Sequence, residues 1–240
     1  MSLHRVRPPA LSRVSWRAGV ALLVLALLAT LAPAGAEQNV RPGINDNYRD
    51  PDVAEWRGVF ERDGREIWDR RDDIVRALAL KPGMRVADVG AGTGFFSLMF
   101  AREVGPQGRV YAVDIARNFV DAIVERARAE GLDNVTGTVN DQQGAHLPDA
   151  AVDLVFVSDT YHHFEYPRAM LDSIHAALAP GGELVVIDFE REPGVSNPWV
   201  IRHVRAGAAQ VTAEIEAAGF ELVERRDFMR TQFFLRFRKR

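Results

Sequence analysis

Apolar and polar positions alternate along the middle of the chain in a way that predicts strands separated by helices. Short apolar runs suited to buried strands lie at 84–89, 108–113, 134–139, 152–158 and 183–189. Between them, apolar residues spaced three and four apart predict helices at 95–104, 117–130 and 167–179. Strands that alternate with helices imply right-handed crossovers and a parallel sheet covered on both faces.

The segments on either side of this alternation have other patterns. Residues 37–51 are polar and contain proline and glycine breakers, which predicts an extended arm. Residues 52–80 carry apolar side chains at helical spacing, which predicts one or two amphipathic helices. A helix is predicted at 199–218, and the strand-like runs 220–229 and 231–238 predict an antiparallel hairpin that closes one edge of the sheet.

The first 36 residues have the pattern of a secretory signal peptide. Four arginines and no acid precede an apolar run at 19–31, and Ala34-Gly35-Ala36 resembles a cleavage site. The run is short for a membrane-spanning helix, which needs about 20 residues. We therefore expect export to a bacterial periplasm with cleavage near Ala36. An inner-membrane anchor, the only membrane contact expected, is one alternative, and a cytoplasmic location with a non-functional leader is another.

This pattern divides the chain into a leader at 1–36, an arm with lid helices at 37–80, and a main domain at 81–240.

Composition then excludes several functions. The chain has no cysteine, which excludes disulfides, thiolate metal sites and a cysteine nucleophile. Its formal charge is −3 and the leader carries four arginines, so the remainder is acidic, which argues against a nucleic-acid partner.

A glycine-rich turn follows the first strand of the alternating region, in the sequence VADVGAGTGF at 86–95. In a doubly wound sheet, nucleotide-like ligands bind at this position. The dinucleotide fingerprint G-x-G-x-x-G fails, because its sixth position, counted from Gly90, is Phe95. Asp88 would repel a pyrophosphate and suits a ligand that carries an amine or another cation.

Two further polar positions follow the next strands. Asp114 ends the second strand, where a carboxylate can accept hydrogen bonds from ribose hydroxyls. Asp141 follows the third strand and could meet an adenine edge, with Gln142 as an alternative. For each aspartate the competing interpretation is a helix cap or turn residue, which we favour for Asp141 taken alone.

These motifs together resemble the class I S-adenosylmethionine-dependent methyltransferases over residues 52–240. The resemblance rests on DVGAGTGF after a strand, an acid at the end of the next strand, VDLVFVSD and LAPGGEL. It implies a doubly wound, Rossmann-like α/β fold with strand order 3-2-1-4-5-7-6, strand 7 antiparallel, and S-adenosyl-L-methionine as cofactor. It also implies individual contacts: Asp88, Gly90, Ala91, Gly92 and Gly94 at the methionine part, Asp114 at the ribose, Ile115, Asp141 and Gln142 around the adenine, and Ser158 with Asp159 beside the methyl-transfer site.

The residues after the fourth strand are candidates for acceptor chemistry. His163 or His162 is the candidate base, Asp159 a candidate orienting group, and Tyr161 could offer its phenol or ring face to a sulfonium. The competing interpretation makes the histidines structural or cofactor-lining. A metal site formed by Asp159 and both histidines is disfavoured because adjacent side chains rarely converge on one ion, so no metal is expected.

Other candidates for lining the acceptor site lie outside the sheet. His203 and Arg205 could hold an anionic substrate, unless they form a solvated helix face. The full set is Asn45, Asn47, Tyr48 and Trp56 from the arm and first helix, and Arg191, Trp199, His203 and Arg205 after the fifth strand.

We interpret the chain as a methyltransferase that transfers a methyl group to a small-molecule acceptor by in-line displacement. Intact Asp88, Asp114 and glycine positions disfavour the alternative, an exported non-catalytic protein that binds S-adenosylmethionine or another small molecule. A dehydrogenase is a weaker alternative because of Phe95. The sequence does not select the acceptor atom.

Overall fold

The computed structural model describes residues 37–194 and 196–240, and Glu37–Arg240 form one compact unit. The predicted leader at 1–36 lies outside the described residues. Among the helices of the described part, none has the length and apolar character needed to cross a membrane. The arm and lid helices at 37–80 belong to the same unit as the sheet.

Seven strands form one sheet in the order β3-β2-β1-β4-β5-β7-β6. The strands from β3 to β5 pair in parallel, whereas β7 is antiparallel to both β5 and β6. This confirms the predicted fold, including the hairpin at the sheet edge. The strands are β1 (Arg85–Val89), β2 (Arg109–Asp114), β3 (Val135–Val139), β4 (Val152–Ser158), β5 (Leu178–Phe189), β6 (Phe220–Arg226) and β7 (Gln232–Lys239).

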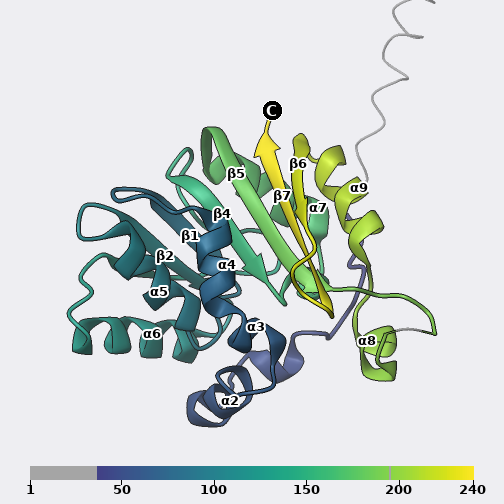
Figure 1. Ribbon diagram of the computed structural model, residues 1–240, viewed down its shortest axis with the longest axis horizontal. Helices are drawn as coiled ribbons and strands as arrows, with labels where there is room; N and C mark the ends of the chain where they lie inside the picture. The colour runs from purple at the N-terminus through teal and green to yellow at the C-terminus, as the bar shows by residue number, and fades with distance from the viewer. Residues whose placement is uncertain (1–36, 195) are drawn as a thin grey trace, which may run out of the picture. The chain divides into compact units, whose positions relative to one another are not determined.

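Helices cover both faces of the sheet (Figure 1). The apolar side chains of α4 and α5 pack on one face, and those of α7 and α9 pack on the other. Short helices of the lid lie beyond the ends of the parallel strands. The helices are η1 (Asp46–Tyr48), α2 (Val53–Phe60), α3 (Glu66–Asp69), α4 (Arg71–Leu78), α5 (Phe95–Val104), α6 (Arg117–Ala129), η2 (Tyr161–His163), α7 (Pro167–Ala177), α8 (Pro198–His203) and α9 (Ala208–Ala217).

Three predicted elements differ from the structure. The helix expected at 199–218 is divided into α8 and α9, because Val204 is extended and Gly207 begins α9 as an extended N-cap. Strand β5 begins at Leu178, earlier than the predicted 183, and continues through a turn where Gly181 has φ +73°. The helical region at 52–80 contains three short helices rather than one or two.

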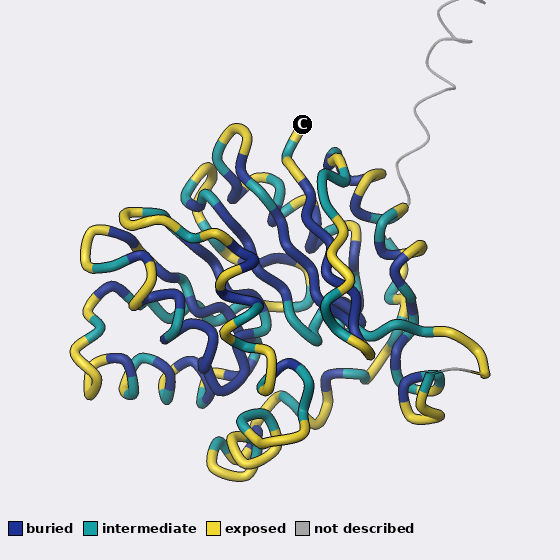
Figure 2. The backbone as a smooth tube through the Cα atoms, in the orientation of Figure 1, coloured by how far each residue is buried: buried dark blue, intermediate teal, exposed yellow. Residues whose placement is uncertain are grey.

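The central strands are buried along most of their length, whereas the lid is largely exposed (Figure 2). Phe156 of β4 is fully buried and packs edge-to-face against Phe96 and Phe100 of α5, with ring centroids 4.9 and 5.2 Å apart. Such aromatic contacts add to the stabilisation from apolar burial. The rigid base of the site therefore lies in the sheet and the helices that cover it.

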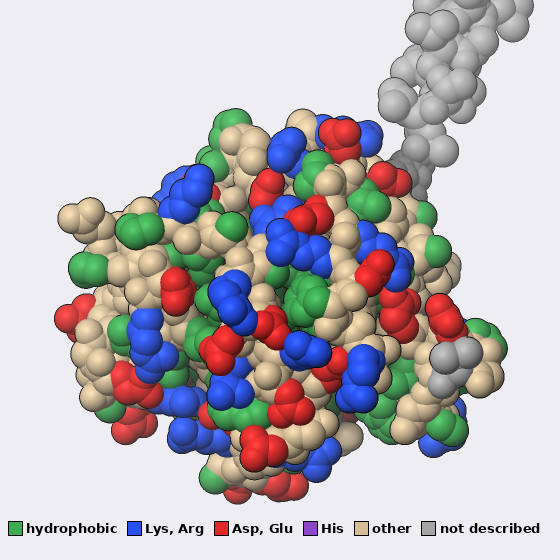
Figure 3. All heavy atoms as spheres, viewed as in Figure 1, with side chains coloured by type: hydrophobic (Ala, Val, Ile, Leu, Met, Phe, Trp, Pro, Cys, Tyr) green, Lys and Arg blue, Asp and Glu red, His purple; other side chains and the backbone are tan. Residues whose placement is uncertain are grey.

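Acidic and basic side chains are interspersed on the face shown in Figure 3. Several are joined in ion pairs between neighbouring elements, such as Arg236 with Glu183 and Glu224. This face therefore has no continuous basic area of the kind that nucleic-acid binding requires.

We predict that Phe156→Ala lowers the free energy of unfolding by about 3–5 kcal/mol, because it leaves a cavity between β4 and α5. Urea unfolding followed by circular dichroism measures the change. Val40→Ala is the matched control, since Val40 is 47% exposed, and should change the stability by less than about 0.5 kcal/mol. Equal losses in the two variants would contradict the assignment of Phe156 to the core.

Candidate functional site

A cavity of about 1160 Å³ lies where β1, β2, β4 and β5 end, and the lid and α8 contribute to its wall. Parallel strands end at a common edge, so the loops after them converge there. The end at β1 and β2 is lined by the glycine-rich turn and Asp114, and the end at β4 and β5 by imidazole and aromatic rings.

The glycine-rich turn brings backbone directly to the wall of the cavity. Gly90 has φ +76°, and a Cβ there would lie 2.2–2.7 Å from side-chain atoms of Thr160. A Cβ on Gly92 would lie 3.1 Å from the Phe60 ring. A side chain at Gly90 would therefore force Thr160 out of place, and one at Gly92 would press on Phe60.

Gly94 has a different role from the one that the family resemblance implied. It is not part of the cavity wall, and a Cβ there would lie 2.4 Å from Ile123 of α6. Gly94 has φ +79° and begins α5. The structure therefore makes Gly94 a packing residue that allows α6 to approach the turn, rather than a ligand contact.

Asp88 and Asp114 are buried carboxylates at this end of the cavity. Asp114 accepts hydrogen bonds from the backbone N–H groups of Gly92 (2.8 Å) and Ala116 (2.9 Å), and burial raises its pKa to about 6. Asp88 accepts a hydrogen bond from the Ser97 hydroxyl (2.6 Å), and burial raises its pKa to about 7. Within residues 37–240 neither carboxylate forms an ion pair, so both could bind a cationic or hydroxyl-bearing ligand.

The other predicted cofactor contacts lie along the same wall: Ala91, Ile115, Asp141, Gln142 and Ser158. Asp141 is exposed and accepts hydrogen bonds from the backbone N–H groups of Gln143 and Gly144, so it also has the turn role that we favoured for it alone. Gln142 donates to Glu165 (2.6 Å). The Ser158 hydroxyl is buried without a hydrogen-bond partner in the described part of the chain.

These residues fit an adenosyl cofactor. Gly90 and Gly92 line the cavity, and Asp114 keeps lone pairs free for ribose hydroxyls after accepting two backbone N–H groups. Asp88 offers negative charge without a cationic side chain beside it, which suits the ammonium and sulfonium groups of S-adenosylmethionine.

Tyr161 lies away from the cavity, which corrects the role proposed for it. Its ring is fully buried in the core, and its hydroxyl donates a hydrogen bond to Glu214 of α9 (2.8 Å). The turn η2 directs Tyr161 toward α9 and the following two histidines toward the cavity. Tyr161 therefore supports the structure and does not face a ligand.

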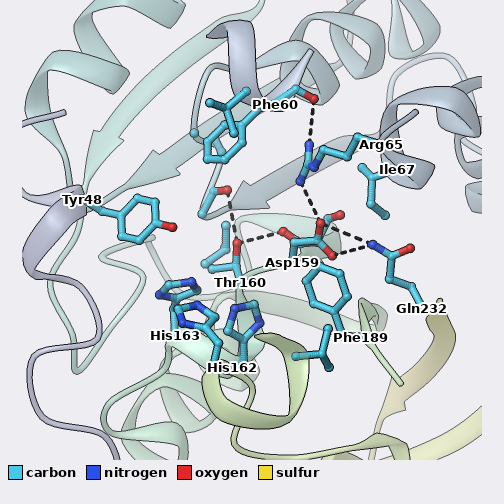
Figure 4. Close-up of a pocket in the computed structure, with 18 of the residues that line it drawn as sticks. Tyr48, Phe60, Arg65, Ile67, Asp159, Thr160, His162, His163, Phe189 and Gln232 are labelled. Atoms are coloured by element: carbon cyan, nitrogen blue, oxygen red, sulfur yellow. Dashed lines mark hydrogen bonds and ion pairs between the residues drawn. The ribbon is translucent and has the colours of Figure 1, made fainter. Parts of the chain in front are cut away.

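His162 and His163 line the end of the cavity at β4 and β5, where Figure 4 shows them next to each other. Different groups orient the two rings. Nδ1 of His162 lies 2.8 Å from a carboxylate oxygen of Asp188, which is buried. Nδ1 of His163 lies 3.1 Å from Oδ1 of Asn45. Burial, helped by the neighbouring His162 and His203, lowers the pKa of His163 to about 2. His203 of α8 lines the same end, and we call the three residues the histidine cluster.

Asp159 does not orient either histidine by a hydrogen bond, contrary to our expectation. Its carboxylate instead pairs with Arg65 (2.8 Å) and accepts a hydrogen bond from Gln232 (3.2 Å), as Figure 4 shows. Its backbone has φ +48°, which turns the side chain away from the course of β4. Asp188 of β5 takes the orienting position at His162 that we expected Asp159 to hold.

Sequence reasoning missed Arg65, Asp188 and Gln232. An acid inside the otherwise apolar run of β5 was the available signal for Asp188, because a buried carboxylate requires a partner. Arg65 and Gln232 reach Asp159 from positions 94 and 73 residues away, and no local pattern shows these contacts.

Most of the other predicted lining residues do reach the cavity: Asn45, Asn47, Tyr48, Trp56, Trp199 and His203. Arg205 does not. Both of its terminal nitrogens pair with Glu214 at 2.8 Å. Arg191 donates to the carbonyls of Val204 and Ile201. Arg205 and Arg191 are therefore not available to hold an anionic substrate.

Known proteins match the part of the chain that forms the sheet and the cavity. Residues 80–227 match a family model described as a methyltransferase domain. The chain is 32% identical over 126 residues to the ubiquinone/menaquinone biosynthesis C-methyltransferase UbiE of Hydrogenovibrio crunogenus, a match that covers 52% of this chain and 49% of that protein. It is 28% identical over 118 residues to the demethylmenaquinone methyltransferase of Geobacillus kaustophilus, covering 49% and 50%. The chain thus spans about half the length of these curated relatives.

A solved structure resembles the chain over a longer stretch. The crystal structure of a SAM-dependent methyltransferase from Aquifex aeolicus has a TM-score of 0.69 and 25% sequence identity, and the match covers 79% of this chain and 99% of that one.

We predict that Arg65→Met lowers the free energy of unfolding by about 2 kcal/mol, because it leaves the buried Asp159 without its cation. The double variant Arg65→Met/Asp159→Asn should recover most of this loss. Chemical unfolding of the four members of this double-mutant cycle measures the coupling. Additive losses would show that the Arg65–Asp159 pair does not anchor the lid.

Proposed function

Since this chain belongs to the methyltransferase-domain family, we propose that it transfers the methyl group of S-adenosylmethionine to a small, ring-bearing acceptor held beside the histidine cluster. The observation that carries the proposal is one continuous cavity with two chemically different ends. Its volume of about 1160 Å³ exceeds the about 300–1,000 Å³ usual for one small-molecule site. It therefore has room for a cofactor and an acceptor together.

The cofactor occupies the end formed by the glycine-rich turn. Asp114 accepts the ribose hydroxyls, Asp88 faces the cationic methionine part, and the unpartnered Ser158 hydroxyl lies on the way to the acceptor. When bound, the sulfonium supplies an electrophilic methyl group. The protein's task is to hold the acceptor atom in line with it, since orientation supplies much of the rate enhancement in such displacements.

The acceptor end favours a flat and largely uncharged molecule. Aromatic rings from the arm, α2, β5 and α8 line it: Tyr48, Trp56, Phe189 and Trp199. Two of the arginines at this end are already paired, Arg65 with Asp159 and Arg225 with Glu190 and Asp227. The curated relative named for ubiquinone/menaquinone biosynthesis is a C-methyltransferase, which supports a ring as the acceptor.

The histidine cluster is the part of the site that can deal with the acceptor's proton. Because Nδ1 of His162 faces Asp188 and Nδ1 of His163 faces Asn45, the Nε2 atoms remain for the ligand. The buried carboxylate of Asp188 fixes the ring of His162, whereas His163 is held by the neutral amide of Asn45. The geometry therefore favours His162 as the group that takes the acceptor's proton. The sequence analysis had placed His163 first.

Cofactor binding should strengthen as the pH rises from about 5 to 8. The pKa values of Asp88 and Asp114 are raised from 3.8 to about 7 and about 6, so the unliganded fold binds protons more tightly than the unfolded chain does. The resulting stabilisation of the folded state is present below about pH 4 and is lost as the pH rises through about 6–7. A cationic ligand favours the charged carboxylates, so binding releases protons.

Calorimetric titration of the full-length protein with S-adenosylmethionine in buffers of different ionisation enthalpy measures both effects. Asp114→Asn should weaken binding at least tenfold at pH 8 through lost hydrogen bonds to the ribose. Asp121→Asn, on the exposed side of α6, is the control and should bind normally. Binding that is independent of pH, or unaffected by Asp114→Asn, would contradict the placement of the cofactor.

Turnover tests the acceptor end and separates an enzyme from a non-catalytic binder. With an acceptor identified by screening phenols and quinols for S-adenosylhomocysteine formation, His162→Asn should lower kcat at least about 100-fold. Asparagine keeps a donor for Asp188, so the fold and the affinity for S-adenosylmethionine should be retained. His175→Ala, remote from the cavity, should keep full activity. Normal turnover by His162→Asn would exclude a role for this residue in proton transfer.

A further inference from the structure

The histidine cluster has a geometry that neither the cofactor nor the acceptor ring requires. One ring nitrogen from each of His162, His163 and His203 lies within 4.8 Å of those of the other two. The ring centroids are 4.3, 5.1 and 5.3 Å apart. Three imidazoles bound to one tetrahedral ion, with metal–nitrogen distances of about 2.0–2.1 Å, have centroids about 5 Å apart.

Two of the rings are held in the orientation that metal ligands need. Asp188 contacts Nδ1 of His162, and Asn45 contacts Nδ1 of His163. Metal-binding histidines almost always use the second ring nitrogen in this way, and a carboxylate partner is typical of zinc sites. Asp188 is further fixed because it accepts the backbone N–H of His162 (3.0 Å) and of Phe189 (2.8 Å).

The third ring supplies an independent observation. Nε2 of His203 is buried and has no hydrogen-bond partner in the described part of the chain. The ring is stacked on Trp199, with centroids 4.5 Å apart and planes inclined by 20°, which limits its movement. A buried polar atom without a partner is costly, so this nitrogen indicates a missing ligand.

We propose that His162, His163 and His203 bind one divalent transition-metal ion of the zinc class, with an open coordination position facing the cavity. Three neutral imidazoles suit zinc and its borderline neighbours rather than magnesium or calcium. Three protein ligands with one open position are typical of catalytic zinc sites. The charge of the ion would be partly balanced by Asp188, behind His162.

This set differs from the one that the sequence disfavoured, which consisted of Asp159 and the two adjacent histidines. Asp159 is occupied by Arg65 and Gln232 and is replaced by His203 from α8. Two adjacent histidines can converge here because both belong to the tight turn η2. Small rotations of the side chains bring the nitrogens to the separation of about 3.3 Å that a tetrahedral ion needs.

The ion's role, though not its binding, rests on the proposed function. An acceptor hydroxyl bound at the open position loses its proton to water more readily, because a metal ion lowers the pKa of a bound hydroxyl group. The Nε2 atom of His162 then ligates the ion instead of taking the proton itself. The acceptor class that fits is a ring that carries a hydroxyl group.

Metal titration of the untagged full-length protein tests the site without reference to activity. After dialysis against a chelator, Co²⁺ should bind with one ion per chain and give the intense visible absorption of a four-coordinate site, and equimolar Zn²⁺ should displace it. His203→Ala should weaken binding at least 100-fold. Asp188→Asn should weaken it about 10–100-fold through the ligand's orientation, and His175→Ala should bind as the parent protein does.

Circular dichroism melts establish that each variant is folded. A folded parent protein that binds no Co²⁺ or Zn²⁺, or binding that survives His203→Ala unchanged, would overturn the proposal. The titration with S-adenosylmethionine distinguishes this failure from a failure of the proposed function. A protein that binds the cofactor and transfers methyl groups without metal would leave His162 as the proton acceptor.

Discussion

Burial of carboxylates at one edge of a parallel sheet is the constraint on which the rest of the site depends. Asp88, Asp114, Asp159 and Asp188 lie at or next to the carboxyl ends of β1, β2, β4 and β5, and each is removed from bulk water. A buried charge is costly unless it is paired or hydrogen-bonded. The partner of each carboxylate therefore differs between the acceptor end and the cofactor end of the cavity.

Two of the four carboxylates are satisfied by side chains of the protein, and this fixes the lid and the histidine cluster. Arg65 attaches the segment between α2 and α3 to Asp159, and His162 is held by Asp188. Among the described residues, Asp88 and Asp114 have only hydroxyl or backbone donors, so their negative charge remains for a ligand. The same physical requirement thus fixes the side chains of the acceptor end and leaves negative charge free at the cofactor end.

The sequence predicted what depends on local pattern. The strand order followed from the resemblance, and most element positions followed from periodicity, because a buried strand and an amphipathic helix each have their own spacing. It could not predict the direction of neighbouring side chains in the turn η2, where Tyr161 enters the core and His162 faces the cavity. It also could not predict that Asp188, rather than Asp159, supports His162, because this pairing depends on the register of β5 against β4 and on the left-handed backbone of Asp159.

A crystal structure of the protein with S-adenosylhomocysteine tests the central claim most directly, since the claim concerns one cavity with two ends. We expect the ribose hydroxyls on Asp114, the adenine beside Ile115, and the sulfur directed past Ser158 toward the histidine cluster. A ligand bound elsewhere, or a sulfur atom directed away from His162 and His163, would contradict the account.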